Sequence, residues 1–321
     1  MTLRGFLGML LLLAAQVVFA QGSYPSRGVR VIVPFPAGGS NDVLCRILGE
    51  KLSAKWGQTV VVENRAGAGG NIGADAVFKA EADGHMLLCS PPGPLSINHN
   101  LYKALNYEPA KFVSITVLAI VPNVVTARLD LPANSIKELI AHAKANPGKI
   151  NYASQGNGST SHLSGAMLQT MAGLELVHIP YKGEGPALVD IVAGRVDIFI
   201  GNLAAALKFH QSNRAKILAV ASTRRSPVLP EVPTAAEAGL PGFVTSAWFG
   251  LVAPPGATAA IVNKLNADAV EALKLPEVRA RFLEQGAEPV GNTAAEMAAF
   301  VKEEMTRWQE VIRTANVTLS N

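Results

Sequence analysis

The feature that most constrains this chain is a repeated order of short apolar strand, glycine-rich turn and amphipathic helix. The first cycle is a β-branched strand over 30–34, a turn through Gly38 and Gly39, and a helix over 41–54. Further strands are expected over 59–63, 85–89, 149–154, 175–180, 196–200 and 215–221, and further helices over 71–80, 161–171, 186–193 and 203–211. This alternation predicts an α/β protein with parallel strand pairs and right-handed crossovers.

The order of elements predicts two doubly wound α/β lobes that are not consecutive blocks of sequence. A long extended run over 117–127 leads out of the first α/β unit, and a strand over 247–253 leads back after an irregular stretch. Three helices follow over 257–275, 276–285 and 293–315. We therefore expect lobe 1 to comprise residues 21–123 plus 224–321 and lobe 2 to comprise residues 124–223, with a ligand cleft between them.

The first twenty residues are typical of a secretory signal peptide. Arg4 precedes an apolar run from Phe6 to Ala20, and small residues end that run. The run is shorter than the roughly 20 residues that a membrane-spanning helix needs. We predict cleavage after Ala20 and export to the periplasm, with 1–20 as the signal peptide.

Charge and cysteine content exclude several classes of protein. The formal net charge is +4, and the lysines and arginines are scattered, so we expect no nucleic-acid partner. Cys45 and Cys89 are the two cysteines, and they cannot supply a cysteine-rich metal site. Both lie in apolar segments, which favours buried free thiols over a disulfide.

Two strand-to-helix turns have the composition of an anion site. One turn contains Gly38, Gly39 and Ser40, and the other runs over 154–162. A helix that starts after glycines leaves its first backbone N–H groups free, and the helix dipole adds positive potential there. Two such helix starts facing each other across a cleft could hold a carboxylate or a dicarboxylate. Either turn alone would also fit an ordinary helix cap.

Sequence motifs for catalysis and for nucleotide binding are absent. GxxxxGK[ST], GxSxG and HExxH do not occur, and the GxGxxG pattern that starts at Gly67 fails because Ile72 stands at its last position. The alternative function is an exported α/β hydrolase that uses Ser159 or Ser161 with His162. A histidine at a helix start more often caps or packs than acts as a base. We expect no enzyme activity, no metal and no cofactor.

Other residues at strand ends are candidate walls of the pocket, although each also has an ordinary structural explanation. Lys182 could attract an acid or lie in solvent, and Trp248 could line a pocket or belong to the core. The candidates of this kind are Ser90, Gln155, Tyr181, Lys182, Gly201, Asn202 and Trp248.

Several motifs in one order resemble the Bug proteins, the periplasmic solute receptors of tripartite tricarboxylate transporters. The resemblance rests on the runs 24–42, 62–73, 158–163, 180–187, 230–234 and 248–251, and it extends over residues 24–315. It implies a type II periplasmic binding fold that closes on a small carboxylate. Carried over by position, it implies ligand contacts from Phe35, Ala37, Gly38, Gly39 and Ser40, with Gly158, Ser159, Thr160 and Ser161 opposite.

The resemblance also bears on the ligand and the partners. Family members that bind amino acids often have an acidic residue where this chain has Gly201, so we expect a mono- or dicarboxylic acid without an amine. It further implies membrane subunits of a tripartite tricarboxylate transporter as partners. A sensor kinase is the alternative partner, and we expect the receptor to be a monomer.

Overall fold

The computed structural model describes residues 24–318, so the predicted signal peptide over 1–20 lies outside the described residues. The strands are β1 (Val29–Val33), β2 (Val60–Asn64), β3 (Met86–Ser90), β4 (Val113–Ala127), β5 (Ile150–Ser154), β6 (Leu176–Pro180), β7 (Ile198–Asn202), β8 (Lys216–Val220), β9 (Ser246–Ala253) and β10 (Glu288–Pro289). The α-helices are α2 (Ser40–Trp56), α3 (Asn71–Phe78), α4 (Ile136–Ala145), α5 (Thr160–Ala172), α6 (Glu184–Val192), α7 (Leu203–Gln211), α8 (Ala259–Lys274), α9 (Pro276–Glu284) and α10 (Ala294–Thr314).

The strands form one continuous curled sheet in the order β2-β1-β3-β9-β4-β7-β5-β6. Strand β1 pairs in parallel with β2 and β3, and β5 pairs in parallel with β6 and β7. These pairs confirm the parallel pairing expected from the sequence. We call β1, β2, β3, β9 and β10 the first half-sheet, and β5, β6, β7 and β8 the second half-sheet.

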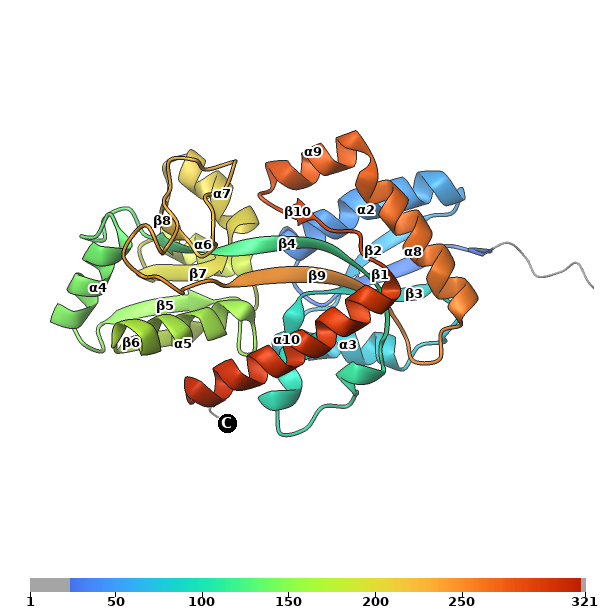
Figure 1. Ribbon diagram of the computed structural model, residues 1–321, viewed down its shortest axis with the longest axis horizontal. Helices are drawn as coiled ribbons and strands as arrows, with labels where there is room; N and C mark the ends of the chain where they lie inside the picture. Colours follow the sequence, from blue (N-terminus) through green and yellow to red (C-terminus); the bar gives the residue numbers. More distant parts are fainter. Residues whose placement is uncertain (1–23, 319–321) are drawn as a thin grey trace, which may run out of the picture.

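Strand β4 belongs to both half-sheets. Its residues from Val113 to Pro122 pair with β9, and those from Asn123 to Ala127 pair with β7. Figure 1 shows β4 and β9 running side by side through the middle of the molecule, with α8 near one end and α4 beyond the other. At the change of partners, the Asn123 N–H donates to the carbonyl of Thr245 at 3.0 Å. The two half-sheets are therefore joined by a hydrogen-bonded ladder.

Most predicted elements are confirmed within a few residues, and the main differences lie in one segment. Strand β4 starts at Val113, four residues before the predicted run, and short helical turns occupy 93–100 and 109–111. Residues 93–97 are all buried, so no apolar face alternates with a polar face there. The sequence therefore shows no helical periodicity in this segment. The segment packs instead against α10, a contact that no local pattern indicates.

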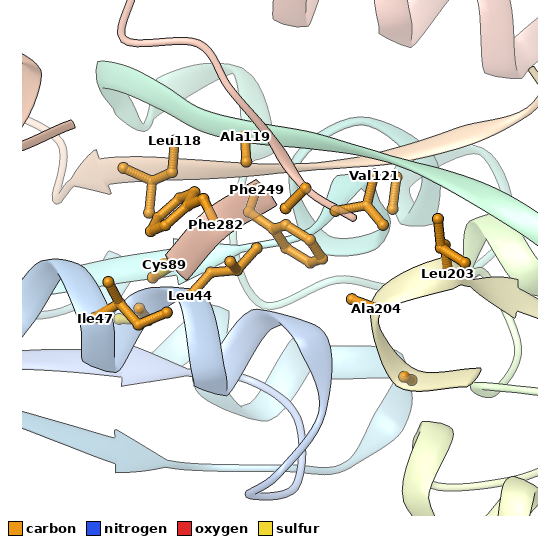
Figure 2. Close-up of a cluster of buried hydrophobic side chains, with 14 of the residues drawn as sticks. Leu44, Ile47, Cys89, Leu118, Ala119, Val121, Leu203, Ala204, Phe249 and Phe282 are labelled. Carbon is orange, nitrogen blue, oxygen red and sulfur yellow. The ribbon is translucent and has the colours of Figure 1, made fainter. Parts of the chain in front are cut away.

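The largest apolar core extends from one half-sheet to the other. Figure 2 shows Phe249 of β9 between Leu44 of α2 and Leu203 at the start of α7. A smaller cluster joins Ile97, Leu163 of α5, and Trp308 and Ile312 of α10. Helix α10 runs diagonally beneath both halves in Figure 1. Apolar packing thus continues across the junction.

The two thiols are buried and free, as the sequence favoured. Cys45 and Cys89 are 2% and 0% exposed, and the Cys89 thiol donates to the Asn41 side-chain oxygen at 3.2 Å. Between residues 24 and 318, no helix is both long and apolar enough to cross a bilayer.

Candidate ligand-binding site

A cavity lies between the start of α2 and the strand ends of the second half-sheet. Residues from both halves line it: Phe35, Pro36, Ala37, Gly39, Ser40, Asn41, Asp42, Pro91, Gln155, Gly183, Glu184, Gly185, Asn202 and Phe249. Its walls are apolar where the proline and phenylalanine rings lie, and polar where α2 and α6 begin. This combination of an apolar body and a few convergent polar groups is typical of small-molecule sites.

The polar end of the cavity is the first turn of α2. Gly39 caps the helix in an extended conformation without a side-chain bond, so the first N–H groups of α2 point outward. A Cβ at Gly39 would lie 3.3 Å from the Glu184 carboxylate, which leaves little room for a larger residue. Preceding Gly38 adopts a positive φ of 81°, which favours glycine at the turn. The sequence thus exposes the helix N-terminus to the cavity.

Asp42 is buried in the first turn of α2, but its charge is already balanced. Its carboxylate accepts hydrogen bonds from Gly38 N–H at 2.9 Å, from Arg46 Nε at 3.0 Å and from Asn64 Nδ2 at 2.9 Å. Burial alone would raise the pKa of Asp42, but these hydrogen bonds outweigh it and hold the pKa below its usual value. Asp42 therefore stays ionised and serves to fix the turn.

A carboxylate of the chain itself occupies the anion position. Glu184, the first residue of α6, is 6% exposed. Its Oε2 accepts from Ser40 N–H at 2.8 Å and from Ser40 Oγ at 2.9 Å, and its Oε1 accepts from Gln155 Nε2 at 2.9 Å. Asn202 adds hydrogen bonds from its backbone and its side chain. The backbone and hydroxyl donors at the start of α2 therefore hold a carboxyl group of the chain itself.

The electrostatics of Glu184 are set by burial among neutral donors. Burial raises the pKa of its carboxyl, and the hydrogen bonds from Ser40 and Asn202 act in the opposite direction. On the same wall, Asn202 Oδ1 is buried without a hydrogen-bond partner. A buried unpaired acceptor is unfavourable, so a donor supplied from the cavity would be stabilising there.

The structure brings six of the predicted site residues to this cavity. These six are Phe35, Ala37, Gly39, Ser40, Gln155 and Asn202. Gly38 lines a neighbouring cavity, which is also lined by Ser40 and by residues of α7. The predicted residues outside the lining of the central cavity are Gly38, Ser90, Gly158, Ser159, Thr160, Ser161, Tyr181, Lys182, Gly201 and Trp248.

Trp248 belongs to the core in this structure. It is 1% exposed, its Nε1 donates to Glu304 Oε2 at 2.9 Å, and its ring meets Phe300 edge to face. Trp308 Nε1 donates to the same Glu304 oxygen at 2.8 Å. Of the two readings open from the sequence, the structure thus favours the core tryptophan.

The hydroxyl groups proposed for a hydrolase are engaged elsewhere. Ser159 Oγ donates to the Gly156 carbonyl at 2.6 Å. It also accepts from the backbone N–H of His162 and so caps α5. Ser161 Oγ donates to the Ile200 carbonyl. The His162 ring stacks on His178 with centroids 4.2 Å apart. No serine–histidine pair poised for nucleophilic attack is formed by these three predicted residues.

Sequence reasoning missed several residues of the cavity, of which Glu184 matters most. It also missed Pro36, Asn41, Asp42, Pro91, Gly183, Gly185 and Phe249 as lining residues. Glu184 directly follows Gly183 at another strand-to-helix turn. A glycine just before a helix start is the same signal that indicated Ser40. The position of Gly201 indicated no acidic group near the ligand, but Glu184 brings one from a different loop. Residues 24–318 contain no cluster of three acidic, histidine or cysteine side chains placed to hold a metal.

Comparisons with known proteins place the chain in a family. The chain matches the family model of the tripartite tricarboxylate transporter family receptor over residues 44–317. It is 41% identical to the protein BugT of Bordetella pertussis over 299 residues, which cover 92% of each chain.

Two solved structures from Rhodopseudomonas palustris share the fold. Rpa4515, solved with adipate, is 38% identical with a TM-score of 0.90, covering 92% of this chain and 99% of that one. MatC, solved with malate, is 35% identical with a TM-score of 0.85, covering 90% of this chain and all of the other. The fold is thus that of a periplasmic binding protein, and these relatives are solute receptors, not enzymes. The chain belongs to the receptor family of the tripartite tricarboxylate transporters.

Proposed function

We propose that this receptor binds a small carboxylic acid without an amine in the cavity at the start of α2 and delivers it to the membrane subunits of a tripartite tricarboxylate transporter. One observation carries the proposal: the N–H and hydroxyl of Ser40, together with Gln155, already hold a carboxylate group. Neutral, oriented donors at a helix start bind carboxylates without needing a cationic side chain.

The proposed organisation follows the change of partners along β4. Residues 21–123 with 224–321 form lobe 1, and residues 124–223 form lobe 2. Apart from Trp248, which belongs to the core, the residues predicted from the sequence stay our proposed contact set for the liganded state, in which other loop residues can approach the cavity. We propose that the mature chain is periplasmic and monomeric, and that the transporter is favoured over a sensor kinase as partner because the family match is to transporter receptors.

The proposal of an amine-free acid rests on the relatives solved with adipate and with malate. Gly201 supplies no counter-charge for an ammonium group, and the Asp42 carboxylate is already engaged by Arg46 and Asn64. The unpaired Asn202 Oδ1 would accept a hydrogen bond from a hydroxyl or a protonated carboxyl of the ligand. A dicarboxylate with or without a hydroxyl fits these groups.

Isothermal titration of the purified mature protein tests the proposal with adipate, malate, aspartate and glutamate. We expect binding of at least one of the first two acids and a heat signal near zero for the amino acids. Ser40→Ala removes one donor and should weaken binding about fivefold to tenfold. Ser53→Ala, at the other end of α2, is the matched control and should bind as the wild type does. Binding of aspartate or glutamate alone would refute the amine-free ligand.

A further inference from the structure

We propose that Glu184 is a tethered competitor of the ligand: its carboxylate occupies the carboxylate position of the empty receptor, and an incoming acid must expel it. This inference rests on the proposed function, because it concerns the same site. It assigns Glu184 as the residue that determines which acids bind.

The first support is the completeness of the hydrogen bonding around Glu184. Both carboxylate oxygens accept bonds from donors that line the cavity, at 2.8 to 2.9 Å from Ser40 and Gln155. A free ligand would find these donors already used. The bonds also join α2, which packs on the first half-sheet, to α6 and the β5–α5 turn, which belong with the second half-sheet.

The second support is the lack of a cation. Within residues 24–318, no lysine, arginine or histidine forms an ion pair with Glu184. A structural carboxylate buried to this degree normally has a cationic partner, because neutral donors compensate only part of its lost hydration. Glu184 has instead the surroundings that a transferable ligand carboxylate would have.

The third support is a route of exit. Glu184 is the first residue of α6, and its neighbours Lys182 and Gly185 are both exposed. The side chain can therefore turn toward solvent by rotation about its own bonds, without unfolding the helix. Because Gly183 before it has no side chain, that rotation is not obstructed from the preceding residue.

The consequence concerns the class of ligand. A monocarboxylate that displaces Glu184 exchanges one carboxylate for another and gains little, while it competes with a group held permanently at the site. An acid with a second polar group makes additional contacts, for example with Asn202 Oδ1. The receptor should therefore reject acetate and accept dicarboxylates.

The test compares the wild type with Glu184→Ala and Glu184→Gln, titrated with adipate, malate, acetate and aspartate. If Glu184 fills the site at least nine-tenths of the time, its removal should tighten dicarboxylate binding about tenfold or more. Acetate, which should not bind the wild type measurably, should bind Glu184→Ala. Glu175→Ala, an exposed glutamate just before β6, is the matched control and should leave all affinities unchanged.

The outcomes separate the two proposals. If the wild type binds dicarboxylates and Glu184→Ala, with a melting curve that shows it folded, binds them equally or more weakly, the tethered competitor is refuted and the proposed function stands. If no acid binds the wild type or the folded variant, both proposals fail. Loss of aspartate binding in Glu184→Gln, with aspartate bound by the wild type, would make Glu184 a receptor for an ammonium group instead.

Discussion

Acidification should destabilise this receptor through one pair of stacked histidines. The rings of His162 and His178 lie 8° from parallel with centroids 4.2 Å apart, and Tyr152 stacks on the other side of His178. Burial lowers the pKa of His162 to about 4. Burial, and secondarily the charge of His162, lowers the pKa of His178 to about 3. Both rings are hydrogen-bonded to the segment 154–158, which includes Gln155.

Acidification lowers the stability because the unfolded chain binds more protons than the folded chain. In the unfolded chain both histidines titrate near the ordinary value of 6.5, whereas in the folded chain they stay neutral to much lower pH. The unfolded state therefore binds more protons below about pH 6.5, and stability falls as the pH falls through that range. Between about pH 8 and about pH 5, the titration of His162 should lower the free energy of unfolding by about 2 kcal/mol. His178 is partly exposed, so solvent screening reduces its share to about 1 kcal/mol.

Urea unfolding at several pH values measures this loss, with His162→Asn and His178→Gln as variants. Asparagine places an amide near the Nδ1 that accepts from Gly158, and glutamine places one near the Nε2 that meets Ser154 Oγ at 2.7 Å. The double variant should lose about 3 kcal/mol less than the wild type on acidification, and each single variant should lie between them. The reasoning is refuted if the wild type and the double variant lose the same free energy over this pH range.

Two further predictions concern stability. Glu304→Ala leaves two buried indole N–H groups without their acceptor, so the free energy of unfolding in urea should fall by about 3 kcal/mol. Glu304→Gln keeps an acceptor oxygen, so its free energy of unfolding should fall by less. Equal losses in the two variants would contradict this role of Glu304. In Gly201→Ala the new Cβ overlaps the Phe199 ring, which should lower the stability by about 2 kcal/mol and so lower the melting temperature. In the control Gly185→Ala the new Cβ meets no atom within 4 Å, so this variant should melt near the wild type. Similar melting temperatures of the two variants would contradict the overlap with Phe199.

The fold could be predicted from the sequence because its information is local. Apolar runs of strand length, helical periodicity and glycine at the joints mark each α/β step, and these patterns depend on only a few neighbouring residues. The turn over 93–97 could not be predicted, because it is buried against α10, which lies about two hundred residues further along the chain.

The site was predictable in part for the same reason. Free donors at the start of α2 follow from the local order of Gly39 and Ser40, so the anion end of the cavity could be found. The partner of Ser40 could not, because Glu184 is 144 residues away and reaches it only when the two half-sheets come together. Trp248 could not be assigned to the core either, since its partner Glu304 comes from a helix whose docking the sequence does not show.

Strand β4 restricts how such a receptor can be redesigned. A single fifteen-residue strand is aligned with β9 at one end and with β7 at the other. A one-residue insertion near Asn123 would turn every later side chain of the strand to the opposite face, so that one half of the molecule would lose its register. Chimaeras that exchange 124–223 between receptors should therefore keep the length of this strand unchanged.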